Sequence, residues 1–368
     1  MTGGVLSRGV DRAVNRTALP GRLYASSAAT QLVRQAPAVD LLVGAALFRD
    51  TFVRGGNGGH VDLPRAEAVG LRLIGLTIAT SWPDVRGSLS RWHFRSLGLQ
   101  RRAVGSRLAI AEWVIGRIER WCAESAGRLR LIRTLGDLDA CVAEGGPVGV
   151  FLGVQGAHAL EGDLMNVARF RARGLAMLAP GHVMDNDAVG SGTGRRAGGL
   201  SGFGRELLAE LEAQNVIVDL AHMSVAGIED SLPILRRPFV LSHAGIRAPG
   251  AASTRRLRRY NASTRNVPAD IAHEVGVRGG LFGVVLATQL LGGSTLAHAG
   301  AMIGRAIGAA GAANVALGSD MDGALRMVID VEGLPALADR LLEEHMEPSV
   351  VSGVLGGNAT RFLRASLS

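Results

Sequence analysis

Short apolar runs alternate along the chain with longer amphipathic stretches, which is the pattern of β-strands and helices around a parallel sheet. The runs contain few polar residues, as expected of strands that are buried on both faces. Eight such runs are present, and they predict a single (β/α)8 TIM barrel. The predicted strands are Ala38–Val43, Leu71–Thr80, Val148–Val154, Leu175–Ala179, Val216–Ala221, Phe239–Ser242, Gly280–Ala287 and Val315–Ser319.

Helices are predicted between these strands. Phe203–Glu212 repeats apolar residues at i, i+4 and i+8, with Ser201 as its N-cap. Ala297–Ala312 and Leu334–His345 show the same spacing. Asp84–Arg128 is longer than a simple crossover and holds three of the four tryptophans. It therefore predicts an extra helical insertion after the second strand.

The chain is expected to form one domain. Its 368 residues are within the range of an α/β barrel with insertions, and 47% hydrophobic residues can fill a large core. No internal repeat or low-complexity linker divides it. We predict a loosely ordered N-terminal extension over residues 1–36 and a barrel over residues 37–368, closed from outside by Ser349–Leu363.

The net charge of +8 comes with 40 basic residues, all of them arginine, because the sequence contains no lysine. The arginines are scattered, whereas nucleic-acid-binding proteins usually gather their charge on one face or helix. The densest run is Arg255–Arg259, which spans only five residues. With the many glycines and alanines, this favours a compositional bias, and we expect no nucleic-acid partner.

The expected location is the cytoplasm. Two cysteines, Cys122 and Cys141, are too few for a disulfide framework. No uninterrupted apolar stretch is long enough to cross a membrane, and the first thirty residues lack the apolar segment of a secretory signal.

Polar side chains stand where four of the predicted strands end. The fifth strand ends in His222, the sixth in His243 and the eighth in Asp320, and His182 follows the fourth. In a TIM barrel these carboxyl ends meet at one face, where the chemistry takes place. Three imidazoles and a carboxylate converging there indicate a divalent-metal site or acid–base catalysis.

Several motifs around these residues occur in the order found in membrane (renal) dipeptidases, and the chain resembles that family from about Val39 to its C-terminus. The matching motifs are Gly153-Val-Gln-Gly-Ala-His-Ala-Leu-Glu-Gly-Asp-Leu, Gly199-Leu-Ser-Gly-Phe-Gly-Arg-Glu-Leu, Val218-Asp-Leu-Ala-His-Met-Ser, Val240-Leu-Ser-His-Ala, Arg265-Asn-Val, Leu317-Gly-Ser-Asp-Met-Asp-Gly and Gly356-Gly-Asn-Ala-Thr-Arg-Phe-Leu.

The resemblance implies a hydrolase that cleaves dipeptides with two zinc ions, and a homodimer as the expected assembly. By the same resemblance, His222 and His243 match the histidines that bind one ion. Asp320 matches the aspartate that binds the other ion and handles the proton of the attacking water. His182 matches a histidine that polarises the substrate, and Arg265 the arginine that holds the dipeptide carboxylate.

Three ligand positions of the family are changed. A His-x-Asp pair ends the family's first strand, and Leu42 and Gly44 occupy its positions here. Gln155 replaces a bridging glutamate. Two divalent ions roughly 3.5 Å apart repel by about 19 kcal/mol at an effective dielectric constant of 20, and only Asp320 remains to offset them. We therefore expect at most one zinc ion, or none.

Two functions follow as hypotheses. In the first, His222, His243 and Asp320 hold one ion, the minimum of a catalytic zinc site, and dipeptide or related amide hydrolysis persists at a reduced level. In the second, the barrel is a non-catalytic pseudo-dipeptidase in which Arg265 and His182 bind a carboxylate-bearing small molecule.

Other polar residues are interpreted as structural. His60-Val61-Asp62 is itself a His-x-Asp sequence, but it matches a loop of the family without ligands, so we predict a surface histidine and a capping aspartate. Asp40 lies deeper in the barrel than Leu42. Asp185-Asn186-Asp187 is expected to shape the loop after His182. The histidines predicted to be ordinary surface or interfacial residues are His93, His158, His273, His298 and His345.

Overall fold

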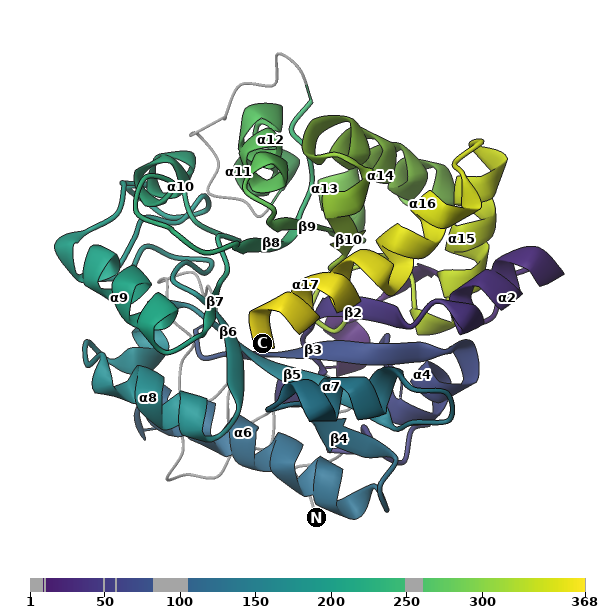
Figure 1. Ribbon diagram of the computed structural model, residues 1–368, viewed down its shortest axis with the longest axis horizontal. Helices are drawn as coiled ribbons and strands as arrows, with labels where there is room; N and C mark the ends of the chain where they lie inside the picture. The colour runs from purple at the N-terminus through teal and green to yellow at the C-terminus, as the bar shows by residue number, and fades with distance from the viewer. Residues whose placement is uncertain are drawn as a thin grey trace.

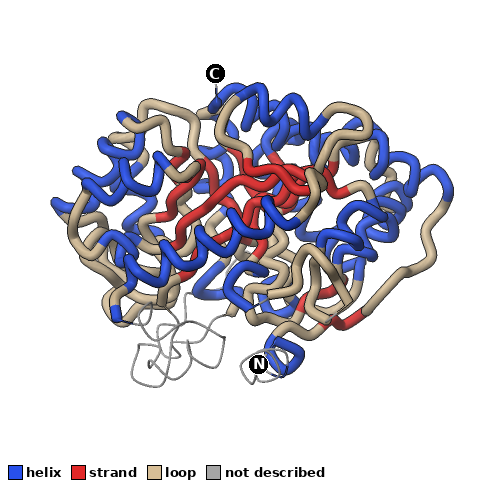
Figure 2. The backbone as a smooth tube through the Cα atoms, turned by 90° about the horizontal axis from the view of Figure 1, so that it is seen from below, coloured by secondary structure: helices blue, strands red, loops and turns tan. Residues whose placement is uncertain are grey.

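The computed structural model describes residues 9, 11–48, 50–56, 58–81, 105–248 and 261–367, and the structural statements below concern these residues. They form a ring of parallel strands surrounded by helices (Figures 1 and 2). Hydrogen-bonded neighbours follow the order β7-β6-β5-β3-β2-β10-β9-β8. A parallel bridge between Asp219 and Val240 joins the two ends. The sheet is therefore a closed eight-stranded barrel, as the sequence predicts.

The strands of the described chain are β1 Thr17–Leu19, β2 Ala38–Val43, β3 Leu71–Ala79, β4 Leu129–Leu131, β5 Val148–Gln155, β6 Leu175–Ala179, β7 Ile217–Val218, β8 Val240–Ala244, β9 Leu281–Val284, β10 Val315–Leu317 and β11 Met327–Ile329. The helices are α2 Ser27–Gln35, α3 Ala45–Phe48, α4 Leu63–Val69, α6 Arg107–Glu124, α7 Leu135–Val142, η2 Ala157–Leu160, α8 Met165–Ala172, α9 Gly202–Ala213, α10 Val225–Ser231, α11 Ala262–Arg265, α12 Ala269–Val277, α13 Thr288–Leu291, α14 Leu296–Ala310, η3 Ala312–Asn314, η4 Val331–Gly333, α15 Leu334–Glu343, α16 Pro348–Ser352, η5 Gly353–Gly357 and α17 Asn358–Leu367.

All eight predicted strands are present, but β7, β9 and β10 are shorter than their apolar runs. β7 covers two residues of the six predicted. Beyond Val218, the Asp219 side chain accepts hydrogen bonds from the backbone N–H groups of Ala221 and Ser242, at 3.0 and 2.9 Å. His222 then adopts a φ of 67°. These side-chain bonds add to the backbone bonds that continue past β7, from the Asp219 N–H to the Leu178 oxygen and from the Leu220 N–H to the Val240 oxygen.

Short strands outside the barrel leave no mark in the apolar pattern. β4 pairs with the first half of β5, and β1 pairs with β11 in a separate two-stranded sheet. Both β1 and α2 lie within residues 1–36, for which a loosely ordered extension was predicted. β1 pairs with β11, and α2 packs on α15. The predicted insertion contains α6, while its residues 84–104 and the arginine run at 255–259 lie outside the described residues.

The C-terminal helix covers one end of the barrel. Figure 1 shows α17 crossing the ring of strands. Phe362 and Leu363 of this helix share a buried cluster with strand residues that include Leu41, Phe151 and Leu281. α17 covers the amino ends of the strands, and the polar strand-end residues lie at the opposite, carboxyl ends.

Candidate functional site

The sequence-predicted site residues come together in part at the carboxyl ends of the strands. A cavity of about 150 Å³, which we call the mouth cavity, is lined by His182, His222, Gln155, Asp320 and Gly44 among others. His243 lies directly behind it, with its Nε2 atom 2.9 Å from Nε2 of His222. Ala79 at the end of β3 also lines the mouth cavity, so six separate strand ends surround one small space.

The hydrogen bonds of His243 define its tautomer. The Ser242 hydroxyl donates to Oδ2 of Asp219 at 2.5 Å, so its oxygen accepts from Nδ1 of His243 at 2.8 Å. Nε2 of His243 is then left with a lone pair. It faces Nε2 of His222 and the side-chain nitrogen of Gln155, which is 3.2 Å away. A neutral imidazole oriented by a carboxylate through a second group is the form that binds metals.

Two buried aspartates hold neighbouring strands together in the same way. Asp219 accepts from the backbone and hydroxyl of Ser242, and Asp40 accepts from the backbone and hydroxyl of Ser319. Each also accepts the backbone N–H two residues further along its own chain. Burial raises the pKa of Asp40 to about 6, although the Ser319 hydrogen bonds oppose this rise. Both aspartates thus close the barrel beneath the site.

Replacing Asp219 with alanine should destabilise the fold by about 3 kcal/mol or more, because three buried donors lose their acceptor. Urea unfolding of Asp219→Ala and of the exposed control Asp187→Ala measures the difference. Asp219→Asn, which retains one acceptor oxygen, should fall between them. If Asp219→Ala unfolds within about 1 kcal/mol of the wild type, the Asp219 hydrogen bonds do not hold the neighbouring strands together as described.

The imidazoles at the mouth are held neutral. Burial lowers the pKa of His182 to about 3, and the positive charge of Arg265 adds to the effect. Burial and Arg265 also lower the pKa values of His222 and His243 well below 6.5. These side chains can therefore accept hydrogen bonds or bind a cation at neutral pH, but they supply no positive charge.

Arg265 is buried at the end of α11, where its Nη2 donates to the backbone oxygen of His243 at 2.9 Å. Among the residues described around the mouth cavity, it is not part of the lining. Its charge acts on the site from behind the histidines. The predicted grip on a ligand carboxylate is thus not visible in this geometry and stays a prediction.

The turn after β10 has an unusual backbone. Asp320, Asp322 and Ala324 have φ values of 61°, 60° and 61°, a conformation that non-glycine residues rarely adopt. All three line the mouth cavity together with His222, whose φ is 67°. Such strain is concentrated at functional sites. The strained backbone around the cavity therefore marks it as the candidate functional site of the barrel.

This turn occupies the corner that the first strand would use for metal ligands. A Cβ atom added to Gly44 would lie 2.5 Å from the backbone oxygen of Asp322 and 2.8 Å from its carbonyl carbon. The Gly44 N–H donates to the oxygen of Met321 at 2.7 Å, which fixes the approach. Leu42 is buried. No side chain fits at position 44 unless the turn moves.

The donor set does not fit the two-zinc centre of the resemblance. Over the described ranges, no three His, Cys, Asp or Glu side chains are arranged to hold a metal ion. Leu42 and Gly44 supply no ligand atom, and the Gln155 amide is neutral. His222 and His243 remain as a close pair of nitrogen donors.

His60 is not the surface residue that the sequence predicted. It is fully buried, where Nδ1 accepts from the backbone N–H of Asp322 and Nε2 contacts the oxygen of Arg16 at 3.0 Å. The Asp322 carboxylate accepts the backbone N–H of His60 at 2.6 Å. Both ring nitrogens are used, so His60 fixes the strained turn and is not a ligand. Asp62 is the N-cap of α4, as predicted.

The prediction for His158 is also wrong, because this residue lies beside the site. It follows β5 in η2, and its ring centroid is 6.1 Å from that of His182. Burial and the neighbouring His182 lower its pKa well below 6.5. In the sequence, only its position three residues after Gln155 indicated that His158 lies close to the site. His273, His298 and His345 are exposed as predicted, and His93 lies outside the described residues.

The loop after His182 is organised by Asp185, as the sequence indicated. Its carboxylate accepts backbone N–H groups of Ser191, Arg196 and Ala197 at 2.8, 2.8 and 3.3 Å. Asn186 accepts from the next turn and donates to Pro180. These contacts fix the wall of the mouth cavity behind His182.

None of the helices in the described residues is both long and apolar enough to span a bilayer.

Solved structures with a similar fold include a metallopeptidase of Rhodobacter sphaeroides bound to a phosphinate mimic of the dipeptide L-Ala-D-Ala. It shares 22% identity and a TM-score of 0.73, over 89% of this chain and 98% of that one. The probable dipeptidase PvdM of Pseudomonas aeruginosa has a TM-score of 0.74 at 17% identity, over 92% and 97%. The fold of the chain is therefore that of these proteins.

Curated relatives are also dipeptidases by name. Dipeptidase 3 of Macaca fascicularis is 27% identical over 83% of this chain and 64% of its own length. An uncharacterized dipeptidase of Schizosaccharomyces pombe is 25% identical over 63% and 56%. The chain thus spans less than two thirds of the length of these relatives. The family model for membrane dipeptidase, peptidase family M19, matches residues 27–367. The chain therefore belongs to the membrane dipeptidase family.

Proposed function

We propose that this protein binds a small dipeptide-like, carboxylate-bearing molecule in the mouth cavity, and that the two-zinc hydrolysis of its family is reduced or lost. The observation that carries the proposal is the closed corner at Gly44, where the Asp322 backbone fills the space of a ligand side chain. With Leu42 and Gln155 also neutral, the site lacks the anionic charge that two divalent ions require.

The remaining groups suit recognition of a small molecule. Three neutral imidazoles, the Gln155 amide and Asp320 can accept or donate hydrogen bonds, and Arg265 supplies positive charge behind them. The dipeptide mimic bound to the Rhodobacter sphaeroides metallopeptidase is consistent with this ligand class. In our proposal, Arg265 attracts the ligand carboxylate and His182 contacts its carbonyl group.

A second candidate is a single-metal hydrolase. The 2.9 Å separation of the His222 and His243 Nε2 atoms favours it, because both point to one spot beside the cavity that Asp320 lines. Zinc bound by these side chains would supply Lewis acidity and an activated water. In that case Asp320 would be the proton acceptor.

Metal analysis, dipeptide hydrolysis and calorimetry on untagged protein test the proposal. We expect at most one zinc ion per chain, no turnover of a dipeptide panel with added zinc, and stoichiometric binding of a phosphinate dipeptide mimic. Arg265→Met should weaken that binding at least about tenfold, whereas the exposed control Arg278→Met should not.

Two other outcomes are informative. One zinc ion with turnover that His222→Ala and His243→Ala both abolish would establish the single-metal hydrolase instead. Two tightly held ions with full turnover would overturn the proposal altogether.

A further inference from the structure

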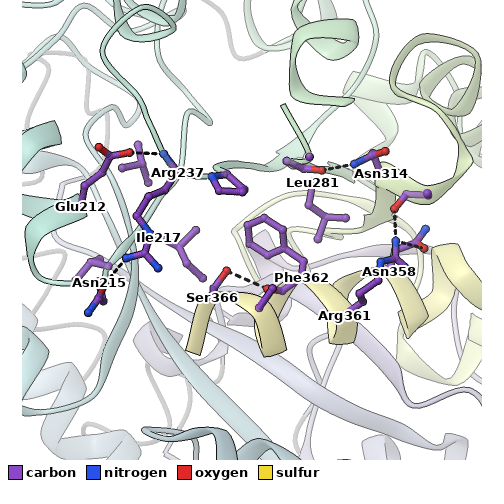
Figure 3. Close-up of a pocket in the computed structure, with 17 residues that line it drawn as sticks. Glu212, Asn215, Ile217, Arg237, Leu281, Asn314, Asn358, Arg361, Phe362 and Ser366 are labelled. Carbon is purple, nitrogen blue, oxygen red and sulfur yellow. Dashed lines mark hydrogen bonds between the residues drawn. The ribbon is translucent and has the colours of Figure 1, made fainter. Parts of the chain in front are cut away.

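A second cavity of about 390 Å³ lies at the opposite end of the barrel from the mouth cavity. We call it the basal pocket. The start of β7, the start of β9 and one face of α17 surround it (Figure 3). It shares no lining residue with the mouth cavity, within the part of the chain that the structure describes. Its volume is within the range of sites for small molecules.

The pocket has an apolar floor. Ile217, Leu281 and Phe362 point into it from β7, β9 and α17 (Figure 3). Ile217 and Phe362 each keep 8% of their surface exposed, although they belong to the same buried cluster as Leu281. A hydrocarbon group placed here would remove this remaining apolar surface from water.

Two arginines face the floor from opposite sides (Figure 3). Nη1 of Arg237 donates to Asn215, and Nη2 of Arg361 donates to the oxygen of Ala313 and to Asn358, at 2.6 and 3.0 Å. These bonds hold one edge of each guanidinium. Among the described side chains no carboxylate pairs with either arginine, so each has donors left for an anion.

One carboxylate, Glu212, also lines the pocket. Its Oε1 atom accepts the backbone N–H groups of Arg236 and Arg237 at 2.9 and 2.8 Å. Glu212 is thus directed at the backbone of the loop before β8. Two guanidinium groups against one carboxylate leave the lining with a net positive charge.

We propose that the basal pocket binds a small amphipathic carboxylate. The hydrocarbon body lies against Ile217 and Phe362, and the carboxylate accepts hydrogen bonds from Arg237. Arg361 adds positive potential from the other side. A neutral molecule would gain no charge-assisted hydrogen bond from the arginines, and a small hydrophilic anion would leave the apolar floor empty. The site requires both features in one ligand and is independent of the function proposed for the mouth cavity.

Titration calorimetry with octanoate tests this, with acetate and 1-octanol as matched probes that lack one of the two features. We expect one octanoate per chain, with each matched probe weaker by at least about tenfold. Arg237→Met should weaken octanoate by at least about tenfold, since it removes a charge-assisted hydrogen bond. Ala365→Phe should abolish binding by filling the pocket, because Ala365 lines it and offers no side-chain hydrogen bond to lose.

Two control variants separate this site from the rest of the molecule. Arg364→Met lies on the same helix, but its guanidinium pairs with Asp139 away from the pocket. His182→Ala alters the mouth cavity instead. Both should bind octanoate like the wild type. The proposal is overturned if octanoate does not bind at millimolar concentration, if 1-octanol binds equally well, if Ala365→Phe and Arg237→Met bind unchanged, or if His182→Ala abolishes binding.

Discussion

Lowering the pH from 6.5 to 5 is expected to reduce the free energy of unfolding by about 3 kcal/mol per pH unit. Four neutral histidines cause the loss. His182 has its pKa lowered to about 3 by burial, and burial also lowers the pKa values of His158, His222 and His243.

The direction follows from proton binding. Below pH 6.5 the unfolded chain protonates these histidines while the folded chain does not, so their stabilisation is present above 6.5 and lost as the pH falls. Asp40 acts in the opposite direction, because burial raises its pKa to about 6 and the folded chain takes up its proton first. Asp219 shifts the same way. Four groups against two leave a net difference of about two protons, hence the slope.

Urea unfolding at pH 8, 7, 6 and 5 in the presence of a chelator measures this slope. The double variant His158→Gln with His182→Gln should reduce it by roughly half or more, whereas the exposed control His273→Gln should leave it unchanged. A free energy of unfolding that is flat or increases from pH 6.5 to 5 would show that the mouth histidines are not buried neutral in solution.

Restoring a carboxylate at position 44 is expected to destabilise the protein instead of rebuilding a metal centre. A Cβ atom there would lie 2.5 Å from the Asp322 backbone oxygen, and the Met321–Gly44 hydrogen bond prevents a simple shift. Overpacking of this kind costs about 1–3 kcal/mol, and more when backbone must move. Gly44→Ala, the smallest change, should already show this loss in urea unfolding. Gly308→Ala is the matched control, since nothing lies within 4 Å of the Cβ atom that it adds.

The same geometry predicts different effects when the changed ligand positions are restored one at a time. From the sequence alone, Leu42→His, Gly44→Asp and Gln155→Glu together would be expected to raise metal occupancy. The structure predicts that Gln155→Glu alone raises zinc affinity, by at least about tenfold. It places a carboxylate next to the Nε2 atom of His243, where Gln155 now lies 3.2 Å away. Adding Gly44→Asp should lower stability without adding a second ion. A stable triple variant that holds two zinc ions would contradict the closed corner.

The barrel follows from the order of apolar and polar residues along the chain. Strands buried on both faces are continuous apolar runs in the sequence, and the polar residues that follow them must meet at one end of a parallel ring. This reasoning is enough to place His182, His222 and Asp320 together. The three-residue strands β1, β4 and β11 escape it, because so short a pairing leaves no periodic signal.

The contents of the site, in contrast, depend on tertiary contacts. Whether Gly44 leaves an empty corner or a filled one depends on the path of the Asp320–Gly323 turn, which lies near the other end of the chain and has φ values that composition does not predict. The sequence predicts a surface His60, because its segment matches a loop of the family without ligands, and an ordinary surface or interfacial His158; neither pattern carries information about burial. Their partners, Asp322 and His182, are brought to them by the closure of the ring. Contacts between segments that are distant in sequence form only when the barrel packs, so local sequence patterns cannot predict them.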